Sequence, residues 1–122
     1  MNGNNILLDT NIILYYLSGD ETLIPLLEEN NLLVSIITEI ELLGFNELSE
    51  TGIENIKLFL SYCIIENISD KIKNEAITLR RSNNLKLPDA IIFATARTLN
   101  IPFITADKHF AKLNDEHIII YE

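Results

Sequence analysis

The sequence predicts an α/β fold: a single-domain, three-layer α/β/α sandwich with a central, mainly parallel sheet. Short apolar runs rich in β-branched residues alternate with longer helical patterns along the chain. Strands separated by helices of this length form parallel β-α-β units, which bury the sheet between two helical layers. The 122 residues show no repeat and no Pro/Gly/Ser-rich linker, so we expect one domain over residues 1–122.

The N-terminal half supplies two of the expected strands. The first is an apolar run that ends abruptly at Asp9, and the helix after it is closed by Gly19. The expected elements are a strand at 6–8, helices at 11–18 and 23–29, a strand at 32–35 and a helix at 38–46.

The C-terminal half carries clearer helix signals. The pattern Thr51-x-x-Glu54 is typical of a capping box and predicts a helix to about residue 62. Ser69 is expected to cap a helix reaching about residue 83, and Pro88 suits the first turn of a helix ending near residue 100. The expected strands are 64–66, 103–105 and 117–121, with a short helix between the last two.

Composition excludes several classes of protein. Hydrophobic residues make up 48% and charged residues 22%, which is typical of a folded chain and not of a disordered one. The longest apolar runs are far too short for a membrane span, and the N-terminus lacks the pattern of a secretory signal. Cys63 is the only cysteine, lies among apolar neighbours and is expected in the core. We therefore expect a cytoplasmic protein with no membrane association.

Charge is distributed unevenly. The net charge is −9, yet all nine Lys and Arg residues lie from Lys57 onward, and residues 1–56 contain none. Such asymmetry indicates a polar binding surface, although charged helix surfaces alone also produce it.

Two acidic residues follow predicted strands. Asp9 comes directly after the first strand, and Asp107 follows the fourth after Thr105 and Ala106. In parallel α/β sheets the ligand site lies at the carboxyl ends of the strands, so these acids are expected at one edge. Each has a structural alternative, because an Asp at this position often caps the next helix. Thr10 and Asn11 are alternative caps that would free Asp9.

Asp89 lies in a segment, 89–96, that is apolar almost all round and predicts a buried helix. Phe93 is one turn further on the same face, so we expect the Asp89 carboxylate to point inward. A buried, unpaired carboxylate is costly unless it is hydrogen-bonded or binds a cation. The alternative is a favourable interaction with the helix dipole in the first turn; burial favours a functional role.

Glu41 shares a helix face with apolar residues, but Thr38-x-x-Glu41 also fits a capping box. Reasoning from the residues alone leaves the choice between Glu41 and Glu39 open.

Taken in order along the chain, the four acids lie in four short motifs: Asp9-Thr10-Asn11, Thr38-x-x-Glu41-Leu42-x-Gly44, Leu87-Pro88-Asp89-Ala90 and Thr105-x-Asp107-x-x-Phe110. This series closely resembles that of PIN-domain nucleases, and among these the VapC toxins of bacterial and archaeal toxin–antitoxin pairs. The resemblance covers essentially the whole chain in length, motif order and short final strand, and it selects Glu41 over Glu39.

The resemblance implies a PIN-like sandwich, a site for one or two Mg²⁺ or Mn²⁺ ions, and endonucleolytic cleavage of RNA. Carboxylates are the ligands that hard divalent ions prefer. Asp9 and Asp107 are expected to bind metal directly, and Glu41 and Asp89 directly or through water.

Neighbouring polar residues are expected to support this site. Thr10, Asn11 and Thr105 would orient the carboxylate oxygens, as groups around metal ligands usually do. A further hypothesis is that Arg80, Arg81 and Lys86 bind RNA phosphates beside the metals; the alternative is a solvated helix end that complements the helix dipole.

The resemblance also implies a homodimer and a small antitoxin partner that occupies the active-site groove. An apolar stripe is a candidate for such contacts, although the same residues are equally suited to the core. It consists of Ile13, Tyr16, Leu17, Leu26 and Leu27.

Other classes fit less well. A phospho-signalling receiver needs an acidic pair after the first strand and an acceptor Asp after the middle one, and the segment 64–67 has no such Asp. A phosphatase of the haloacid dehalogenase type needs Asp-x-Asp, and Asn11 breaks that motif. A PIN-fold RNA- or protein-binding module without catalysis remains an alternative. His109 and His117 fall in no metal-ligand spacing and are expected at the surface or at helix ends.

Overall fold

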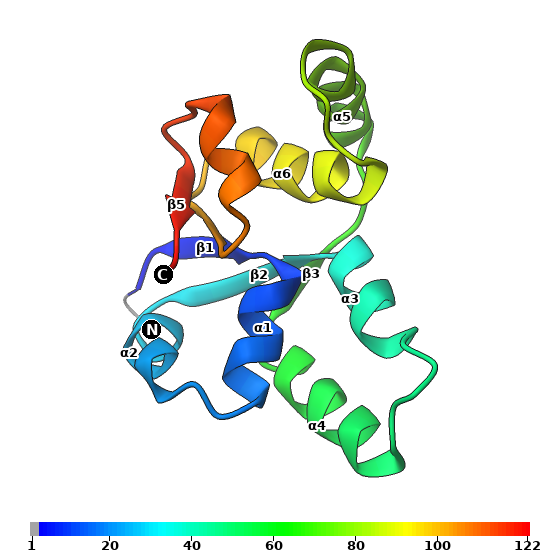
Figure 1. Cartoon of the computed structure of the whole chain (residues 1–122), viewed down its shortest axis with the longest axis vertical. Helices are drawn as coiled ribbons and strands as arrows, with labels where there is room; N and C mark the ends of the chain where they lie inside the picture. The colour runs from blue at the N-terminus through cyan, green and yellow to red at the C-terminus, as the bar shows by residue number, and fades with distance from the viewer. Residues whose placement is uncertain (1–2) are drawn as a thin grey trace.

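The computed structural model describes residues 3–122 and contains a five-stranded sheet between two layers of helices (Figure 1). Every strand pair is parallel, and the strand order is β3-β2-β1-β4-β5. The predicted α/β/α sandwich is confirmed. The strands are β1 (Asn5–Leu8), β2 (Asn31–Ser35), β3 (Ile64–Glu66), β4 (Phe103–Thr105) and β5 (Ile118–Ile120). The helices are α1 (Thr10–Leu17), η1 (Glu21–Leu23), α2 (Ile24–Glu28), α3 (Ile36–Leu43), α4 (Glu50–Leu60), α5 (Asp70–Ser82), α6 (Leu87–Leu99) and η2 (Lys108–Leu113).

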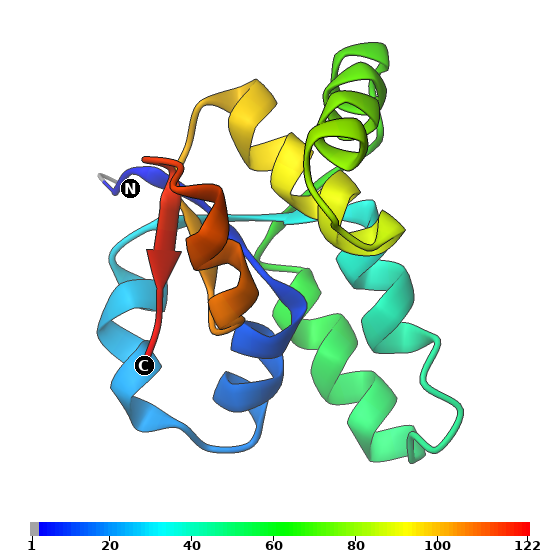
Figure 2. The same cartoon turned by 45° about the horizontal axis from the view of Figure 1, so that its top comes forward.

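The sheet separates two hydrophobic cores. Successive side chains of a strand point to opposite faces, so Ile6 and Leu8 enter one core while Leu7 enters the other. Strands buried on both faces need apolar residues at every position, which is why residues 6–8 read as a continuous run. Figures 1 and 2 show α1, α2 and α4 on one side of the sheet and α5 and α6 on the other.

Two helices begin earlier than expected. The α3 helix starts directly after β2, with the Ser35 hydroxyl accepting the Ile37 N–H, so Thr38 lies inside the helix. Ser49 caps α4 by accepting the Gly52 N–H, and the predicted capping box at Thr51 is wrong. In both cases a serine just upstream of the predicted start supplies the cap.

Other local expectations agree with the structure. The Ser69 hydroxyl accepts the Ile72 N–H at the start of α5, and Pro88 lies in the first turn of α6. Cys63 is half-buried against the core on the α1 and α4 side, where burial raises the pKa of its thiol to about 11. Within residues 3–122, no helix combines the length and apolar character that crossing a membrane requires.

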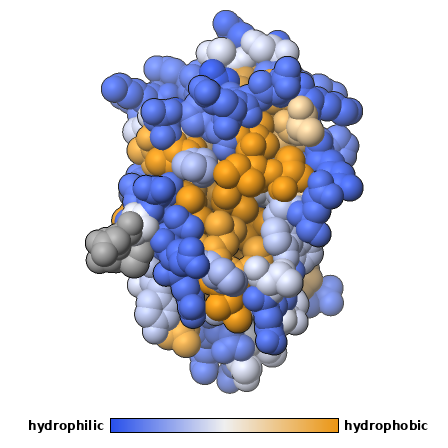
Figure 3. Space-filling model, turned by 90° about the vertical axis from the view of Figure 1, so that its left-hand side faces the viewer, coloured by the Kyte–Doolittle hydropathy of each residue, from blue (hydrophilic) through white to orange (hydrophobic). Residues whose placement is uncertain are grey.

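The proposed apolar stripe mostly serves the core. Ile13 and Leu27 are buried, and the other three members are half-buried against the same cluster. The exposed apolar surface lies at a different place. Figure 3 shows a broad hydrophobic area on the side of the molecule where Figure 1 places α2 and β5. Ile119 of the edge strand β5 is about half exposed.

The order of the strands determines where a site forms. From β1 the chain builds outward through β2 to β3, and it later returns to place β4 on the other side of β1. The helices that follow β1 and β4 leave the sheet on different sides, and in parallel α/β sheets ligands bind at the carboxyl ends of strands where this happens. Asp9 follows β1 and Asp107 follows β4, so the topology brings both acids to this edge.

Candidate active site

Asp9 is a buried carboxylate at the end of β1, with only 6% of its surface exposed. Its Oδ1 accepts the Thr10 N–H at 2.9 Å, and its Oδ2 accepts the Thr105 hydroxyl at 2.6 Å. Burial raises the pKa of Asp9 to about 6, against these two hydrogen bonds, and the charges of Asp89 and Glu41 raise it further. Asp9, and not Thr10 or Asn11, is the N-cap of α1. Capping and a site role are compatible, because each carboxylate oxygen has a second lone pair.

Thr10 joins Asp9 to Glu41. The Thr10 hydroxyl donates to Glu41 Oε1 at 2.7 Å and lies 3.0 Å from the hydroxyl of Thr38, which is fully buried. The capping-box alternative for Glu41 is excluded, because α3 begins before Thr38. The pair Thr38 and Glu41 instead faces the start of α1.

Asp107 is held by two neighbours in the sequence. Its N–H donates to the Thr105 hydroxyl at 3.0 Å, while its Oδ1 accepts the His109 N–H at 2.9 Å and lies 2.9 Å from His109 Nδ1. Partial burial tends to raise the pKa of Asp107, but the hydrogen bonds from His109 outweigh it and lower the pKa. Asp107 also caps η2, as the structural alternative predicted.

Asp89 lies in the first turn of α6, and the helix behind it is buried as predicted. Asp89 itself is half-buried rather than enclosed, and Leu87 in the same turn is exposed. Burial raises the pKa of Asp89, and the charges of Asp107 and Glu41 add to this effect, whereas Lys86 and His109 oppose it. The four acids therefore act on one another electrostatically as a single cluster.

The other predicted residues divide into two groups. Thr10 and Thr105 hydrogen-bond to acids, and Lys86 lies close enough to lower the pKa of Asp89 and Asp107. Asn11 is exposed on α1, and within residues 3–122 no hydrogen bond joins its side chain to the acids. Arg80 lines an apolar groove between α5 and α6, and Arg81 is exposed at the end of α5.

Sequence reasoning missed His109. Its ring is exposed, as expected, but it lies against Asp107 at the acid cluster. The available signal was the Asp-x-His spacing, since an Asp that caps a helix receives the N–H two residues later and brings that side chain alongside.

The donor set has the chemistry of a divalent-metal site. Four carboxylates converge, two of them with raised pKa values, and like charges of this kind favour a cation between them. Within residues 3–122, no three acidic, His or Cys side chains stand close enough to enclose an ion as they are. The fit to a metal rests on the chemistry of the donors: carboxylate oxygens suit Mg²⁺ or Mn²⁺, and Mg²⁺ usually keeps several waters instead of being enclosed by protein donors.

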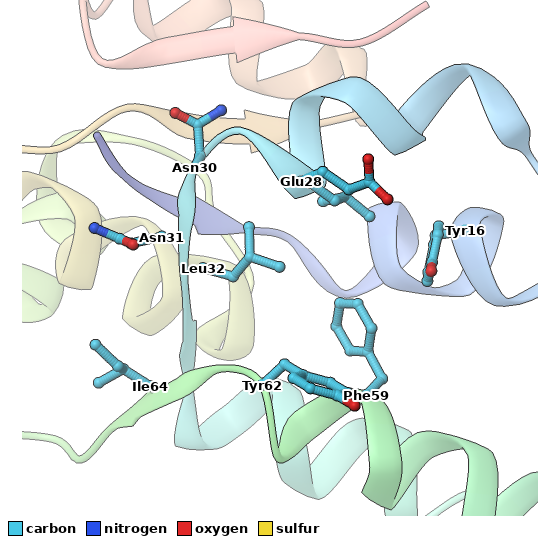
Figure 4. Close-up of a pocket in the computed structure, with 9 residues that line it drawn as sticks. Tyr16, Glu28, Asn30, Asn31, Leu32, Phe59, Tyr62 and Ile64 are labelled. Atoms are coloured by element: carbon cyan, nitrogen blue, oxygen red, sulfur yellow. The ribbon is translucent and has the colours of Figure 1, made fainter. Parts of the chain in front are cut away.

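A pocket lies at the opposite end of the sheet (Figure 4). It has a volume of about 480 Å³ and borders the amino ends of β2 and β3, between α1, α2 and α4. Tyr16 and Phe59 meet there, with ring centroids 5.5 Å apart. None of the four acids lines it.

Fold and site define a three-layer α/β protein with a carboxylate cluster at the switch point of its sheet. The chain belongs to the PIN-domain family, because the PIN domain model matches residues 6–116. This confirms the resemblance read from the motifs.

Solved structures agree with this assignment. A chain of a toxin–antitoxin complex from Klebsiella pneumoniae is 33% identical, with a TM-score of 0.82 and coverage of 96% of this chain and 98% of that one. VapBC-1 from nontypeable Haemophilus influenzae is 25% identical, with a TM-score of 0.77 and coverage of 95% and 97%. DNA-bound VapBC from Salmonella typhimurium, 19% identical with a TM-score of 0.81 and coverage of 96% of each chain, shares the fold. No curated protein matches the sequence.

Proposed function

We propose that the protein is a metal-dependent endoribonuclease that hydrolyses RNA phosphodiester bonds, and the toxin of a type II toxin–antitoxin pair. The observation that carries the proposal is the convergence of Asp9, Glu41, Asp89 and Asp107, from four separate segments, at the carboxyl edge of the sheet. Membership of the PIN family supports nuclease chemistry, and the 33% identical chain belongs to a toxin–antitoxin complex.

In this proposal Asp9 and Asp107 bind Mg²⁺ or Mn²⁺ directly, and Glu41 and Asp89 bind directly or through water. When bound, such an ion supplies an activated water and neutralises charge on the phosphate. The chain's own residues prepare the site for it. The Thr105 hydroxyl holds one oxygen of Asp9, and the Thr10 hydroxyl holds one oxygen of Glu41.

The surroundings of the acids also suit an anionic substrate. Lys86 adds a positive charge beside an otherwise acidic edge, where an RNA phosphate would approach. The half-buried position of Asp89 leaves the edge accessible to a large substrate. The proposal includes a cytoplasmic location, a homodimer and a cognate antitoxin partner, as the family resemblance implies.

A second candidate is a PIN-fold binding module without catalysis. The spacing of the acids favours it, because within residues 3–122 no three of the side chains that bind metals already enclose an ion. Metal-dependent cleavage separates the two candidates.

The test is RNA cleavage by the purified chain with Mg²⁺, with Mn²⁺ and with a chelator. We expect cleavage only with metal, and a loss of at least about a hundredfold in Asp9→Asn. Asp20→Asn is the matched control, because Asp20 also caps a helix by accepting the Thr22 N–H but lies outside the acid cluster. Equal loss in the two variants, or cleavage that survives the chelator, would contradict the proposal.

A further inference from the structure

His109 supplies both hydrogen bonds that the structure gives to one oxygen of Asp107. The His109 N–H donates to Oδ1 at 2.9 Å, and Nδ1 of the ring lies 2.9 Å from the same atom. Since a carboxylate only accepts, Nδ1 is the donor in this pair. Within residues 3–122 the structure gives Oδ2 of Asp107 no hydrogen bond.

We propose that His109 is a positioning residue, whose ring holds Oδ1 of Asp107 so that Oδ2 stays available to a divalent ion. The inference rests on the proposed metal site and deepens it.

The His109 ring restricts rotation of the Asp107 carboxylate, which the backbone cap of the helix does not do by itself. Any residue at position 109 would donate its backbone N–H to Asp107 and complete the cap. A carboxylate held by one donor still turns about its last side-chain bond, because that torsion has a broad energy minimum. A second donor on the same oxygen, from the ring side, restricts this rotation and so fixes where Oδ2 points.

This arrangement extends to the other proposed direct ligand. The Thr105 hydroxyl accepts the Asp107 N–H at 3.0 Å and donates to Asp9 Oδ2 at 2.6 Å. His109, Asp107, Thr105 and Asp9 therefore form one hydrogen-bonded series. Groups that orient metal ligands in this way typically contribute tenfold to a hundredfold to metal affinity.

The His109 ring contributes little to the stability of the fold. The His109 side chain is 81% exposed, so its removal leaves the hydrophobic core and the backbone cap unchanged. Loss of the ring should therefore change metal binding without changing the melting temperature.

Three substitutions at His109 test whether the position of the side-chain N–H matters, or only the presence of a polar side chain. Asn places its side-chain N–H where Nδ1 of histidine lies, whereas Gln places it where Nε2 lies. We expect His109→Ala and His109→Gln to weaken Mn²⁺ binding by about tenfold, and His109→Asn to stay close to wild type. The measurement is an electron paramagnetic resonance titration of free Mn²⁺ with each folded protein, and melting curves verify the fold.

A second readout needs no metal. In ¹⁵N spectra of the metal-free protein at pH 8, we expect His109 as the Nδ1–H tautomer, and a shift of this signal in Asp107→Asn. The Nε2–H tautomer in wild type would overturn the inference.

The titration also has clear contrary outcomes. If His109→Ala binds Mn²⁺ as tightly as wild type, the role of His109 is refuted and the proposed metal site is not. The same conclusion follows if His109→Asn binds Mn²⁺ as weakly as His109→Ala. A wild-type protein that binds Mn²⁺ with the expected pattern but cuts no RNA would refute the proposed nuclease and leave the role of His109 intact. A wild-type protein that binds no Mn²⁺ would overturn both.

Discussion

The two ends of the sheet differ in chemistry although they share the same strands. At the carboxyl edge, burial and the charges of neighbouring acids raise the pKa of Asp9 and Asp89. Threonine hydroxyls donate hydrogen bonds to Asp9 and Glu41. At the amino edge, aromatic and aliphatic side chains from α1, α2 and α4 surround an open pocket. One end concentrates unfavourable charge, and the other extends the hydrophobic core to the surface.

The difference follows from the parallel arrangement of the strands. All strands end at the same edge, so the residue after each strand is free of the ladder and near the start of a helix. Polar side chains collect there, whereas the entering loops at the other edge pack against helix ends. The acid cluster and the aromatic pocket thus lie at opposite ends of the sheet, and substitutions at each end test whether they act independently.

The largest expected effect is on catalysis and compares two glutamates of one helix. Glu41→Gln should lower metal-dependent RNA cleavage by at least about a hundredfold, because it removes a proposed metal-binding charge while the amide oxygen still accepts from Thr10. Glu39→Gln is the matched control on α3 and should change the rate little. Similar rates for the two variants would remove Glu41 from the acid edge.

At the amino edge we expect the reverse, a loss of stability without a loss of chemistry. Phe59→Ala should lower the free energy of unfolding by about 3 kcal/mol, because Phe59 is buried and packs on Tyr16. Urea unfolding measures this, and the cleavage rate per folded molecule should stay the same. Tyr62→Ala, at a side chain that is 75% exposed in the same pocket, should stay within about 0.5 kcal/mol of wild type. A cleavage defect in folded Phe59→Ala would show that the two ends are coupled.

Next, the acid edge should reduce stability at neutral pH. The pKa of Asp9 is raised from 3.8 in the unfolded chain to about 6, so its stabilising contribution is full below pH 3.8 and is lost as pH rises through 6. Asp9→Asn should therefore stabilise the fold at pH 7.5 by on the order of 2 kcal/mol, and by less at pH 4. Urea unfolding at the two pH values tests this. A variant less stable than wild type at pH 7.5 would indicate that the buried charge is compensated.

The smallest expected effect concerns RNA binding at the same edge. In the Asp9→Asn background, Lys86→Ala should weaken RNA binding and reduce the salt slope by roughly 0.7, the value for one contact with a single strand. Arg80→Ala should have less effect, because Arg80 lines the groove between α5 and α6. Fluorescence anisotropy over a range of salt concentrations measures both. A larger slope change for Arg80 would support the original hypothesis that the end of α5 binds phosphates.

The fold class follows from local patterns, and the details of the site do not. Runs such as residues 6–8 already encode a strand buried on both faces, and the strand-end rule places Asp9 and Asp107 at one edge. The starts of α3 and α4 differ from the prediction because the Ser35 and Ser49 hydroxyls, rather than those of the capping-box threonines, accept N–H groups of the first helical turn.

Long-range geometry accounts for the remainder. The half-buried position of Asp89 depends on which elements pack around the start of α6, and the amino-edge pocket depends on Tyr16 and Phe59 meeting from two helices. Neither arrangement produces a local sequence pattern. The spacing between Asp107 and His109 is such a pattern, but only the structure shows that the His109 ring contacts the acid.

The Thr105 hydroxyl has a single proton and contacts both Asp107 and Asp9, so the directions of its two hydrogen bonds are fixed. The Asp107 N–H can only donate, so the hydroxyl must accept from it and give its single proton to Asp9. One side of Asp9 Oδ2 is thus covered from β4. A cation is left with the sides facing away from that strand, so a buried threonine at the end of a neighbouring strand determines the direction from which the acid can be approached.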